Sequence, residues 1–208
     1  MPAVSPCILA LGANPAVQRV LTFEAPIGLG EVNRASSIST YVGGKGQGVA
    51  LALQSWAPAT GRSHWCAQFV GGDSGAWVEE KLCEAGLRRL SIAVPSPTRT
   101  CTTLLGPDGA QTELVEPSGA VRPADVDAMV GDLVGTALPE CGALAMCGTT
   151  PPGGAALYGS LCDALGQSPH LERLLVVLDG HREARERPGH TATRARAPAL
   201  HRRAPSDR

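Results

Sequence analysis

The sequence predicts an α/β protein: a three-layer sandwich built around a mostly parallel sheet, with a smaller sheet at one edge. Short apolar runs that are typical of buried strands alternate with longer segments of helical pattern, and parallel sheets with helices on both faces are built from this alternation. Two strand-like stretches, at about 19–42 and 91–116, break the alternation. They therefore predict a small second sheet, placed as a lid.

The main sheet is assigned to apolar runs that end at turns. Its strands are expected at 6–11, 64–71, 142–148 and 174–179. The helices between them are expected at 49–57, 76–87, 123–138 and 151–166. Asp73 or Ser74 is predicted to cap the second helix and Gly86 to end it. Pro123 is predicted to open the third helix, with acidic residues in its first turn.

The lid is assigned to strand-like segments rich in Ser and Thr. The segment 31–42 alternates polar and apolar residues, as in a strand with one face in water. The segments 91–98 and 98–106 are strand-like as well. A Pro-Asp-Gly-Ala turn at 107–110 then predicts that 111–116 returns as a hairpin partner.

Composition and charge limit the classes of function. The chain has 208 residues and is 43% hydrophobic, which supports a packed core and argues against overall disorder. Its net charge of −1 hides an asymmetry, because residues 181–208 hold eight arginines against three acidic residues. That segment also lacks apolar periodicity. We therefore predict a domain over 1–180 that is followed by a basic, disordered segment over 181–208.

The seven cysteines do not indicate metal or disulfide chemistry. No CxxC pair occurs, no histidine lies at metal-ligand spacing from them, and most lie in apolar stretches. We interpret them as reduced, small core residues. The chain shows neither a signal-peptide pattern nor an apolar stretch of membrane-spanning length, so we expect a cytoplasmic protein with no membrane partner.

The motif Gly43-Gly44-Lys45-Gly46-Gln47-Gly48 is the first candidate for ligand binding. It has the spacing of neither a P-loop nor a dinucleotide-binding fingerprint. Glycines that precede a helix let backbone N–H groups approach an anion closely, and Lys45 would add a positive charge. A purely structural turn is the alternative interpretation.

Three further segments carry candidate chemistry. Gly72-Asp73-Ser74-Gly75 is similar to the nucleophile segment of trypsin-like proteases, but a single histidine and no aspartate precede it, so helix capping is favoured. Residues 147–153 follow a predicted strand, at the end where open parallel sheets gather ligands. Arg99 has the chemistry to bind a phosphate or a carboxylate, and an ion pair with Glu113 or Glu116 is the alternative.

Taken in order, these segments resemble the ribokinase/PfkB carbohydrate kinases, and most of all the subgroup of 1-phosphofructokinase and tagatose-6-phosphate kinase. The matching motifs, between residues 8 and 180, are Gly12-Ala13-Asn14-Pro15-Ala16, Gly30 to Ala35, Gly43 to Gly46, Val70 to Gly75, Thr98-Arg99-Thr100, Thr112-Glu113-Leu114, Gly148 to Gly153 and Val177-Leu178-Asp179. The resemblance implies a ribokinase-like α/β sandwich with a β lid. It also implies transfer of the ATP γ-phosphate to a hydroxyl of a sugar or sugar phosphate, assisted by Mg²⁺.

The resemblance further implies a set of substrate-binding residues. Arg99 would hold the phosphate already present on the substrate, and Glu113 would lie in or near the substrate side of the lid. The residues expected around a sugar or sugar phosphate are Asn14, Gln18, Gly43, Gly44, Lys45, Arg99 and Glu113. Two positions depart from the family's pattern: Gln18 stands where an Asp usually binds sugar hydroxyls, and Gly48 stands where an Asn is usual.

A larger departure is a missing motif. The family's Gly-Ala-Gly-Asp string, which carries the catalytic Asp base, does not occur in the chain, and most of the ATP site is not identifiable either. No catalytic or metal-binding residue is therefore assigned, and the C-terminal part of the fold is expected to be missing. We expect a truncated sugar kinase that does not transfer phosphate. A different sugar or a nucleoside as substrate, a sugar-phosphate-binding module and a non-functional fragment are the alternatives.

Two hypotheses concern partners and the basic segment. The resemblance implies that two copies of this chain can form a homodimer through the lid. An abrupt change to Arg, Ala, Pro and His after residue 180 is typical of a frameshifted reading of GC-rich DNA, with residues 181–184 as the last in frame. An arginine-rich arm for nucleic acid is disfavoured, because no aromatic residues for base stacking accompany the arginines.

Overall fold

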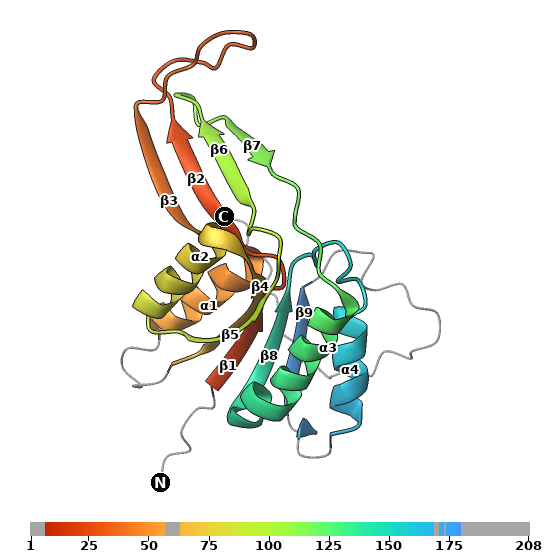
Figure 1. Ribbon diagram of the computed structural model, residues 1–208. Helices are drawn as coiled ribbons and strands as arrows, with labels where there is room; N and C mark the ends of the chain where they lie inside the picture. The colour runs from red at the N-terminus through yellow and green to blue at the C-terminus, as the bar shows by residue number, and fades with distance from the viewer. Residues whose placement is uncertain (1–6, 57–62, 169–170, 173, 180–208) are drawn as a thin grey trace, which may run out of the picture.

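The alternation of apolar runs and helical segments produces a five-stranded sheet between two helical layers (Figure 1). The computed structural model describes residues 7–56, 63–168, 171–172 and 174–179. The predictions made for residues 181–208 concern a segment outside the described residues. Within the described ranges, no helix combines the length and the apolar character that crossing a membrane requires.

The main sheet was predicted to be mostly parallel, and all of its strand pairs are parallel. Its strands are β1 (Cys7–Leu11), β4 (Trp65–Val70), β5 (Arg88–Ala93), β8 (Cys141–Cys147) and β9 (Leu175–Asp179). They lie in the order β5-β4-β1-β8-β9, and each neighbouring pair runs parallel. The helices are α1 (Lys45–Trp56), α2 (Gly72–Glu84), α3 (Pro123–Asp132) and α4 (Leu157–Gly166). Figure 1 shows α1 and α2 on one face of the sheet and α3 and α4 on the other.

Alternation along each strand divides the buried side chains between two cores. Leu9 and Leu11 of β1 are fully buried and belong to the core that includes residues of α3 and α4. Ala10, between them, points to the other face and packs with Ala50 of α1 and Leu82 of α2. A parallel sheet must be covered on both faces, which explains why its central strands read as continuous apolar runs.

The second sheet has four strands, which we call the lid: β2 (Ala16–Thr22), β3 (Ser37–Gly43), β6 (Thr100–Leu105) and β7 (Gln111–Val115). Their order is β3-β2-β6-β7. The predicted hairpin of β6 and β7 is confirmed by their antiparallel pairing, whereas β2 and β6 run parallel. The lid follows directly from the carboxyl end of β1, so it stands beyond that end of the main sheet (Figure 1).

Two predictions about the lid strands were wrong. The segment 91–98 was expected in the lid, but its first residues complete β5 at the edge of the main sheet, where Arg88–Ala93 pair with β4 throughout. Leu90 explains the difference, since its side chain is buried in the larger core. The segment 31–42 was expected to be a strand from its start, but β3 begins only at Ser37. Asn33 instead closes the preceding loop through hydrogen bonds with both backbone groups of Gly28.

The predicted cap of α2 was also wrong. The helix begins at Gly72, and its capping position is Gly71, which has no side chain to cap with. Ser74 turns its hydroxyl away from the helix and donates to the carbonyl of Thr98 at 2.6 Å. This bond ties α2 to the segment that leads into the lid. The predicted stop is confirmed, because Gly86 adopts a left-handed φ of +78° immediately after the helix.

Candidate functional site

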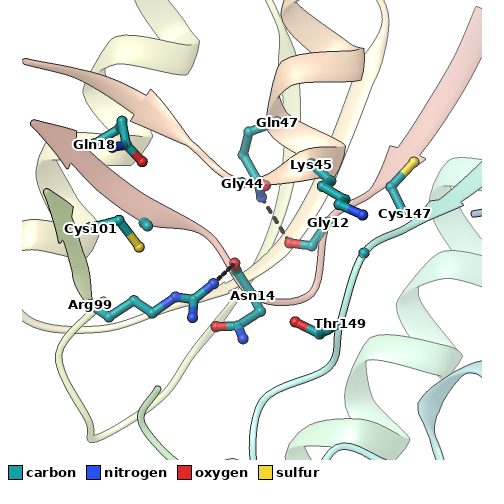
Figure 2. A pocket seen from close by; sticks show the side chains of 12 residues that line it. Gly12, Asn14, Gln18, Gly44, Lys45, Gln47, Arg99, Cys101, Cys147 and Thr149 are labelled. Atoms are coloured by element: carbon teal, nitrogen blue, oxygen red, sulfur yellow. Dashed lines mark hydrogen bonds between the residues drawn. The ribbon is translucent and has the colours of Figure 1, made fainter. Parts of the chain in front are cut away.

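A pocket of about 340 Å³ opens between the carboxyl end of the main sheet and the lid (Figure 2). It is lined by Gly12, Asn14, Ala16, Gln18, Gly44, Lys45, Gln47, Arg99, Cys101, Cys147, Gly148 and Thr149. Its volume falls in the lower part of the range for small-molecule sites, roughly 300–1,000 Å³. A ligand the size of a phosphorylated monosaccharide fits that class of cavity.

Most of these residues lie where the chain passes between the main sheet and the lid. Asn14 lies in the turn from β1 to β2, Lys45 begins α1 and is separated from the end of β3 by one residue, and Arg99 directly precedes β6. Thr149 comes from the turn that follows β8. The topology therefore brings together residues that are far apart in the sequence, at the strand ends where ligands gather in α/β sheets.

The glycines of the pocket allow unusually close packing of backbone segments. A Cβ on Gly46 would lie 2.3 Å from the Gly12 Cα, so α1 meets the turn after β1 with no room for a side chain. Gly44 has a φ of +110°, in the region that favours glycine, and a Cβ there would lie 2.2 Å from Gln47 Oε1. This packing explains why the sequence around Lys45 is so rich in glycine.

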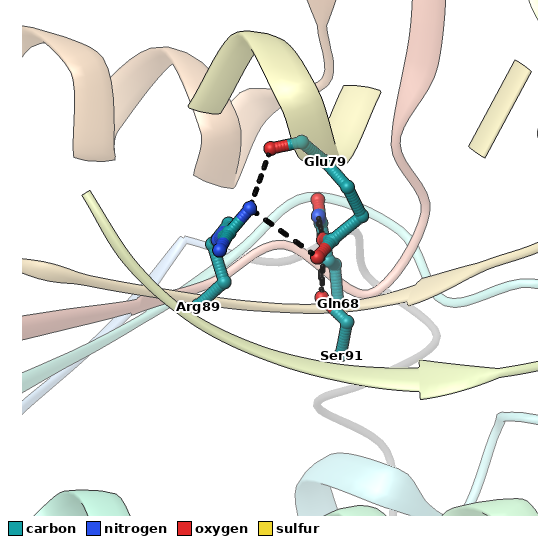
Figure 3. Close-up of polar contacts among 4 residues, drawn as sticks. All are labelled: Gln68, Glu79, Arg89 and Ser91. Atoms are coloured by element: carbon teal, nitrogen blue, oxygen red, sulfur yellow. Dashed lines mark hydrogen bonds and ion pairs between the residues drawn. The ribbon is translucent and has the colours of Figure 1, made fainter. Parts of the chain in front are cut away.

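Gln47 and a row of polar groups support the pocket from behind. Gln47 is fully buried, and its Nε2 donates to the Gly12 carbonyl at 2.8 Å and to Gln68 Oε1 at 2.9 Å. Gln68 Nε2 donates in turn to Glu79 Oε1 at 2.6 Å. Figure 3 shows Ser91 and Arg89 closing this group around Glu79. Buried polar groups that are bonded in this way fix one arrangement of the surrounding backbone.

The pocket carries two positive charges and no negative one among its lining residues. Lys45 and Arg99 are its only ionisable groups of that sign, and no ion pair is formed by either within the described ranges of the chain. Among the described residues, Arg99 makes one long hydrogen bond, from Nη2 to the Asn14 carbonyl at 3.5 Å, and its buried Nε has no partner there. Two uncompensated cations beside a cavity favour an anionic ligand.

The alternative that Arg99 forms a surface ion pair was wrong. Glu113 accepts instead from the Thr103 hydroxyl at 2.6 Å, and Glu116 accepts from the Thr100 backbone N–H at 2.7 Å. Both carboxylates are therefore engaged within the β6–β7 hairpin. Arg99 is left with its guanidinium beside the pocket, as Figure 2 shows.

The two cysteines of the pocket are poor candidates for a nucleophile. Burial raises the pKa of the Cys147 thiol, the nearby Asp179 raises it further, and Lys45 opposes both. Burial likewise raises the pKa of Cys101. Thiols held in the protonated state are weak nucleophiles. The core interpretation fits Cys66, Cys101 and Cys147, which are buried, but was wrong for Cys83 and Cys162, which are exposed on helices.

The structure brings most of the expected site residues together. Asn14, Gln18, Gly44, Lys45 and Arg99 all line the pocket. Two expected residues do not line the pocket: Gly43, which directly precedes Gly44, and Glu113, which lies on the exposed outer strand of the lid. The pocket has five further lining side chains that were not among the expected site residues: Ala16, Gln47, Cys101, Cys147 and Thr149. Gln47, Cys147 and Thr149 belong to segments that the sequence had already singled out. Thr149 was within reach of the argument, since it follows a strand at the carboxyl edge of the sheet.

The described residues do not by themselves fit a nucleotide with Mg²⁺. Mg²⁺ is held by carboxylates and other oxygen ligands, and no carboxylate lines the pocket. In the part of the chain that the structure describes, no group of three or more His, Cys, Asp or Glu side chains is placed to hold a metal ion. What this arrangement offers is a cationic cavity with amide and hydroxyl groups, suited to a polar anion.

Comparison with known proteins points to one group of enzymes. The family described as pfkB family carbohydrate kinase matches residues 14–165. A 1-phosphofructokinase of Haloferax volcanii is 34% identical over 147 residues, which are 70% of this chain and 45% of that protein.

Solved structures share the fold at lower identity. A protein from Thermotoga maritima, described as a possible 1-phosphofructokinase, matches 88% of this chain and 57% of its own with a TM-score of 0.75 at 21% identity. Phosphofructokinase-2 from Escherichia coli, in complex with substrates and products, matches 86% of this chain and 55% of its own with a TM-score of 0.73 at 18% identity. The chain thus spans about half the length of the relatives that it matches.

Proposed function

Because the chain belongs to the pfkB family of carbohydrate kinases, we propose that its pocket binds a phosphorylated sugar of the fructose phosphate type. The observation that carries the proposal is the pair of cations Lys45 and Arg99, which form no ion pair with any described residue, beside a cavity of about 340 Å³ with no carboxylate among its lining residues. An unphosphorylated sugar would leave both charges without a counter-charge. A phosphate group supplies it and can bind the Arg99 fork bidentately.

The roles of the lining residues follow from their chemistry. Arg99 and Lys45 hold the phosphate, and Asn14 and Gln18 bond to sugar hydroxyls. Asn14 Nδ2 already donates to Ser118 Oγ at 2.9 Å, so its Oδ1 is the end left to accept from a hydroxyl. The glycines at 43 and 44 keep the wall thin enough for backbone groups to approach the ligand.

We propose that this chain by itself binds the phosphosugar without transferring a phosphoryl group to it. Transfer to a hydroxyl needs a base within hydrogen-bond reach and groups that neutralise the nucleotide phosphates. None of the lining residues is an Asp, Glu or His, and the two lining thiols are held protonated. ATP and Mg²⁺ belong to the chemistry of the family, and their use by this chain is tested by the same experiment.

Calorimetric titration of the 208-residue chain tests the proposal. Fructose 1-phosphate, fructose 6-phosphate, fructose and ATP–Mg²⁺ serve as ligands. We expect binding of a fructose phosphate and no heat from fructose at the same concentration. Lys45→Met and Arg99→Met should each weaken phosphosugar binding by about tenfold or more, because a charge-assisted hydrogen bond contributes about 1.5–3 kcal/mol.

Arg19→Met is the matched control. Arg19 is exposed, one residue from Gln18 on the same strand, so its side chain lies on the opposite face of the lid. This variant loses the same charge and should bind as the wild type does. Equal weakening in all three variants would show a general charge effect and refute a phosphate site at Lys45 and Arg99. Sugar-dependent consumption of ATP by the purified chain would refute the absence of transfer.

The lid also supports a proposal about self-association. On the face of the lid that turns away from Gln18, the outer strands β3 and β7 carry Ile38 and Leu114, each at least half exposed. We propose that a second copy covers this surface to form a homodimer through the lid. Sedimentation of the wild type and of Leu114→Lys tests it: a dimer that the substitution converts to monomer supports the proposal, and a monomeric wild type at high concentration refutes it.

A further inference from the structure

Three polar side chains form a hydrogen-bonded row across the pocket-facing side of the lid. Gln18 Nε2 lies 2.9 Å from Thr103 Oγ1, which lies 2.6 Å from Glu113 Oε1. The three come from β2, β6 and β7, and the register places Thr103 directly opposite Glu113. Thr103, in the middle, is buried, whereas Glu113 at the outer strand is exposed. The row therefore begins in solvent and ends at the pocket wall.

The number of protons available fixes the direction of the row. An ionised carboxylate only accepts hydrogen bonds, so Glu113 takes the single hydroxyl proton of Thr103. Thr103 then has only lone pairs left for Gln18, and only the NH₂ end of a carboxamide can donate to them. The row thus decides which end of the Gln18 amide faces Thr103.

The other end of the amide is turned toward the ligand cavity. Gln18 lines the pocket, and Figure 2 shows its oxygen on the side that faces the other lining residues. That oxygen lies beside Gly43, at 3.5 Å from where a Cβ of that glycine would be. The Gln18 NH₂ group is directed at Thr103 and, at 3.5 Å, at the Arg19 carbonyl, so Gln18 presents its acceptor to whatever occupies the pocket.

We infer that Thr103 and Glu113 are positioning residues: they hold the Gln18 amide with its oxygen toward the pocket, so that this oxygen can accept from a ligand hydroxyl. The inference rests on the proposed function, because it assigns a part of the phosphosugar pocket. Lys45 and Arg99 hold the anionic end of the ligand. Gln18 then requires a hydroxyl at the lid end, which inorganic phosphate cannot supply in the same pose.

The row also explains why a neutral side chain suits this position. An acidic residue at 18 would accept a hydroxyl as well, but it would place a negative charge on a wall shared with Lys45 and Arg99. The carboxamide accepts without that charge. The row keeps its only negative charge at Glu113, which does not line the pocket. The two cations therefore remain free to bind a phosphate.

Titration calorimetry at pH 7.5 with fructose 6-phosphate, fructose 1-phosphate and inorganic phosphate tests the inference on the full chain. Thr103→Val keeps the shape of the side chain and breaks the row. We expect it to weaken binding of the fructose phosphate about fivefold, as the loss of one oriented hydrogen bond would, while inorganic phosphate binds within about twofold of the wild type. Thr103→Ser restores the hydroxyl and should restore the affinity.

Thr102→Val is the matched control, since Thr102 is the next residue on the same strand and faces the other side of the lid. It should bind both ligands as the wild type does. Gln18→Ala should show the same selective loss as Thr103→Val, and the double variant should lose no more than either single one, because the residues act through one contact. Glu113→Ala, at an exposed position, tests the row without altering a buried residue and should show a smaller loss of the same selectivity.

Each failure has a distinct meaning. Unchanged phosphosugar affinity in Thr103→Val, or additive losses in the double variant, would overturn the inference while leaving the proposed function standing. Equal losses for phosphosugar and inorganic phosphate would show that Thr103 merely maintains the shape of the pocket, which also overturns it. A wild-type chain that binds neither fructose phosphate would refute the proposed function itself.

Discussion

At the scale of single residues, the site depends on side chains that are absent as much as on those present. Gly46 lies in α1, where an alanine would normally be favoured, yet a Cβ there would meet the backbone of Gly12. Gly48 lies two positions further along the same helix, and no atom of the described residues comes within 4 Å of a Cβ placed there. The two glycines therefore have different reasons to be there, although they belong to the same motif.

We expect Gly46→Ala to destabilise the protein by about 1–3 kcal/mol, because backbone atoms of Gly12 must shift to make room. Gly48→Ala, its matched control, should stabilise the protein by up to about 1 kcal/mol through higher helix propensity. Urea unfolding of both variants measures the difference. Equal effects of the two substitutions would show that the close contact between α1 and the turn after β1 does not form.

Cys66 predicts a dependence of stability on alkaline pH. Burial raises the pKa of this thiol from an ordinary value of 9.0 to about 12. Above pH 9 the thiol ionises in the unfolded chain but stays protonated in the fold, so stability is full below pH 9 and falls as the pH rises toward 12. The slope for one such group is about 1.4 kcal/mol per pH unit.

Unfolding in urea at pH 8 and pH 10 measures this effect as the difference between wild type and Cys66→Ala, since other groups also titrate in that window. The wild type should lose about 1.4 kcal/mol more than the variant between the two values. Cys83→Ala, which removes an exposed thiol, should follow the wild type. A wild type and a Cys66→Ala variant with parallel pH profiles would contradict the burial of Cys66.

At the scale of elements, patterns in the sequence predicted strands and helices well where at least one face of the element is buried. The apolar runs that became β1, β4 and β8 needed no knowledge of the rest of the fold. β5 was assigned to the wrong sheet because its place in the main sheet depends on the burial of Leu90. That burial depends on α3, which comes from a distant part of the chain. Strand pattern identifies a strand but not the sheet that it joins.

The site residues also fall into two groups: those that the sequence alone indicates and those that depend on distant parts of the chain. Gly44, Lys45 and Arg99 stand out in the sequence because glycine clusters and isolated cations are visible there. Gln47 and Thr103 do not, since a buried glutamine in a helix and a threonine in a strand have ordinary surroundings in the sequence. Their importance comes from partners in other elements, which only the topology provides.

The start of α3 gives a prediction at this scale. The Asp125 carboxylate accepts from the Arg122 backbone N–H at 2.8 Å and from its guanidinium, as in a capping box. These hydrogen bonds hold the pKa of Asp125 below its ordinary value. At pH values above the ordinary pKa of an aspartate, these hydrogen bonds stabilise the fold. Their contribution to stability is lost as the pH falls through the lowered pKa of Asp125.

Asp125→Asn should therefore lower the stability of the fold at pH 7. It should also make stability decline less steeply as the pH falls below 5, and thermal unfolding over this pH range measures the change. Asp127→Asn, which removes an exposed carboxylate from the same helix, should leave the acid profile close to that of the wild type. If the two variants behave alike, the cap does not contribute.

At the scale of the whole molecule, one side of the main sheet keeps apolar groups exposed. Val49 and Trp56 of α1 are 36% and 81% exposed, and Leu175 and Val177 of β9 are 57% and 51% exposed. The register through β8 places Val177 on the same face of the sheet as Ala10, which is the face that α1 covers. Parallel sheets are normally covered on both faces, so this surface favours association.

We expect the combined variant Trp56→Lys and Val177→Lys to reduce concentration-dependent association of the chain by about tenfold or more, since burying side chains of this size contributes about 1.5–3 kcal/mol each. Light scattering over a dilution series measures it. Leu29→Lys is the control, because Leu29 is 98% exposed in the loop before β3. If Leu29→Lys reduced association to the same extent, the association would depend on the general hydrophobicity of the surface and not on Trp56 and Val177.

The crossings between the two sheets have one more consequence. Asn14, Gly44 and Arg99 are at once walls of the pocket and segments of the chain that join the lid to the main sheet. A substitution at one of these positions therefore acts on the lining of the pocket and on the connection between the two sheets at the same time.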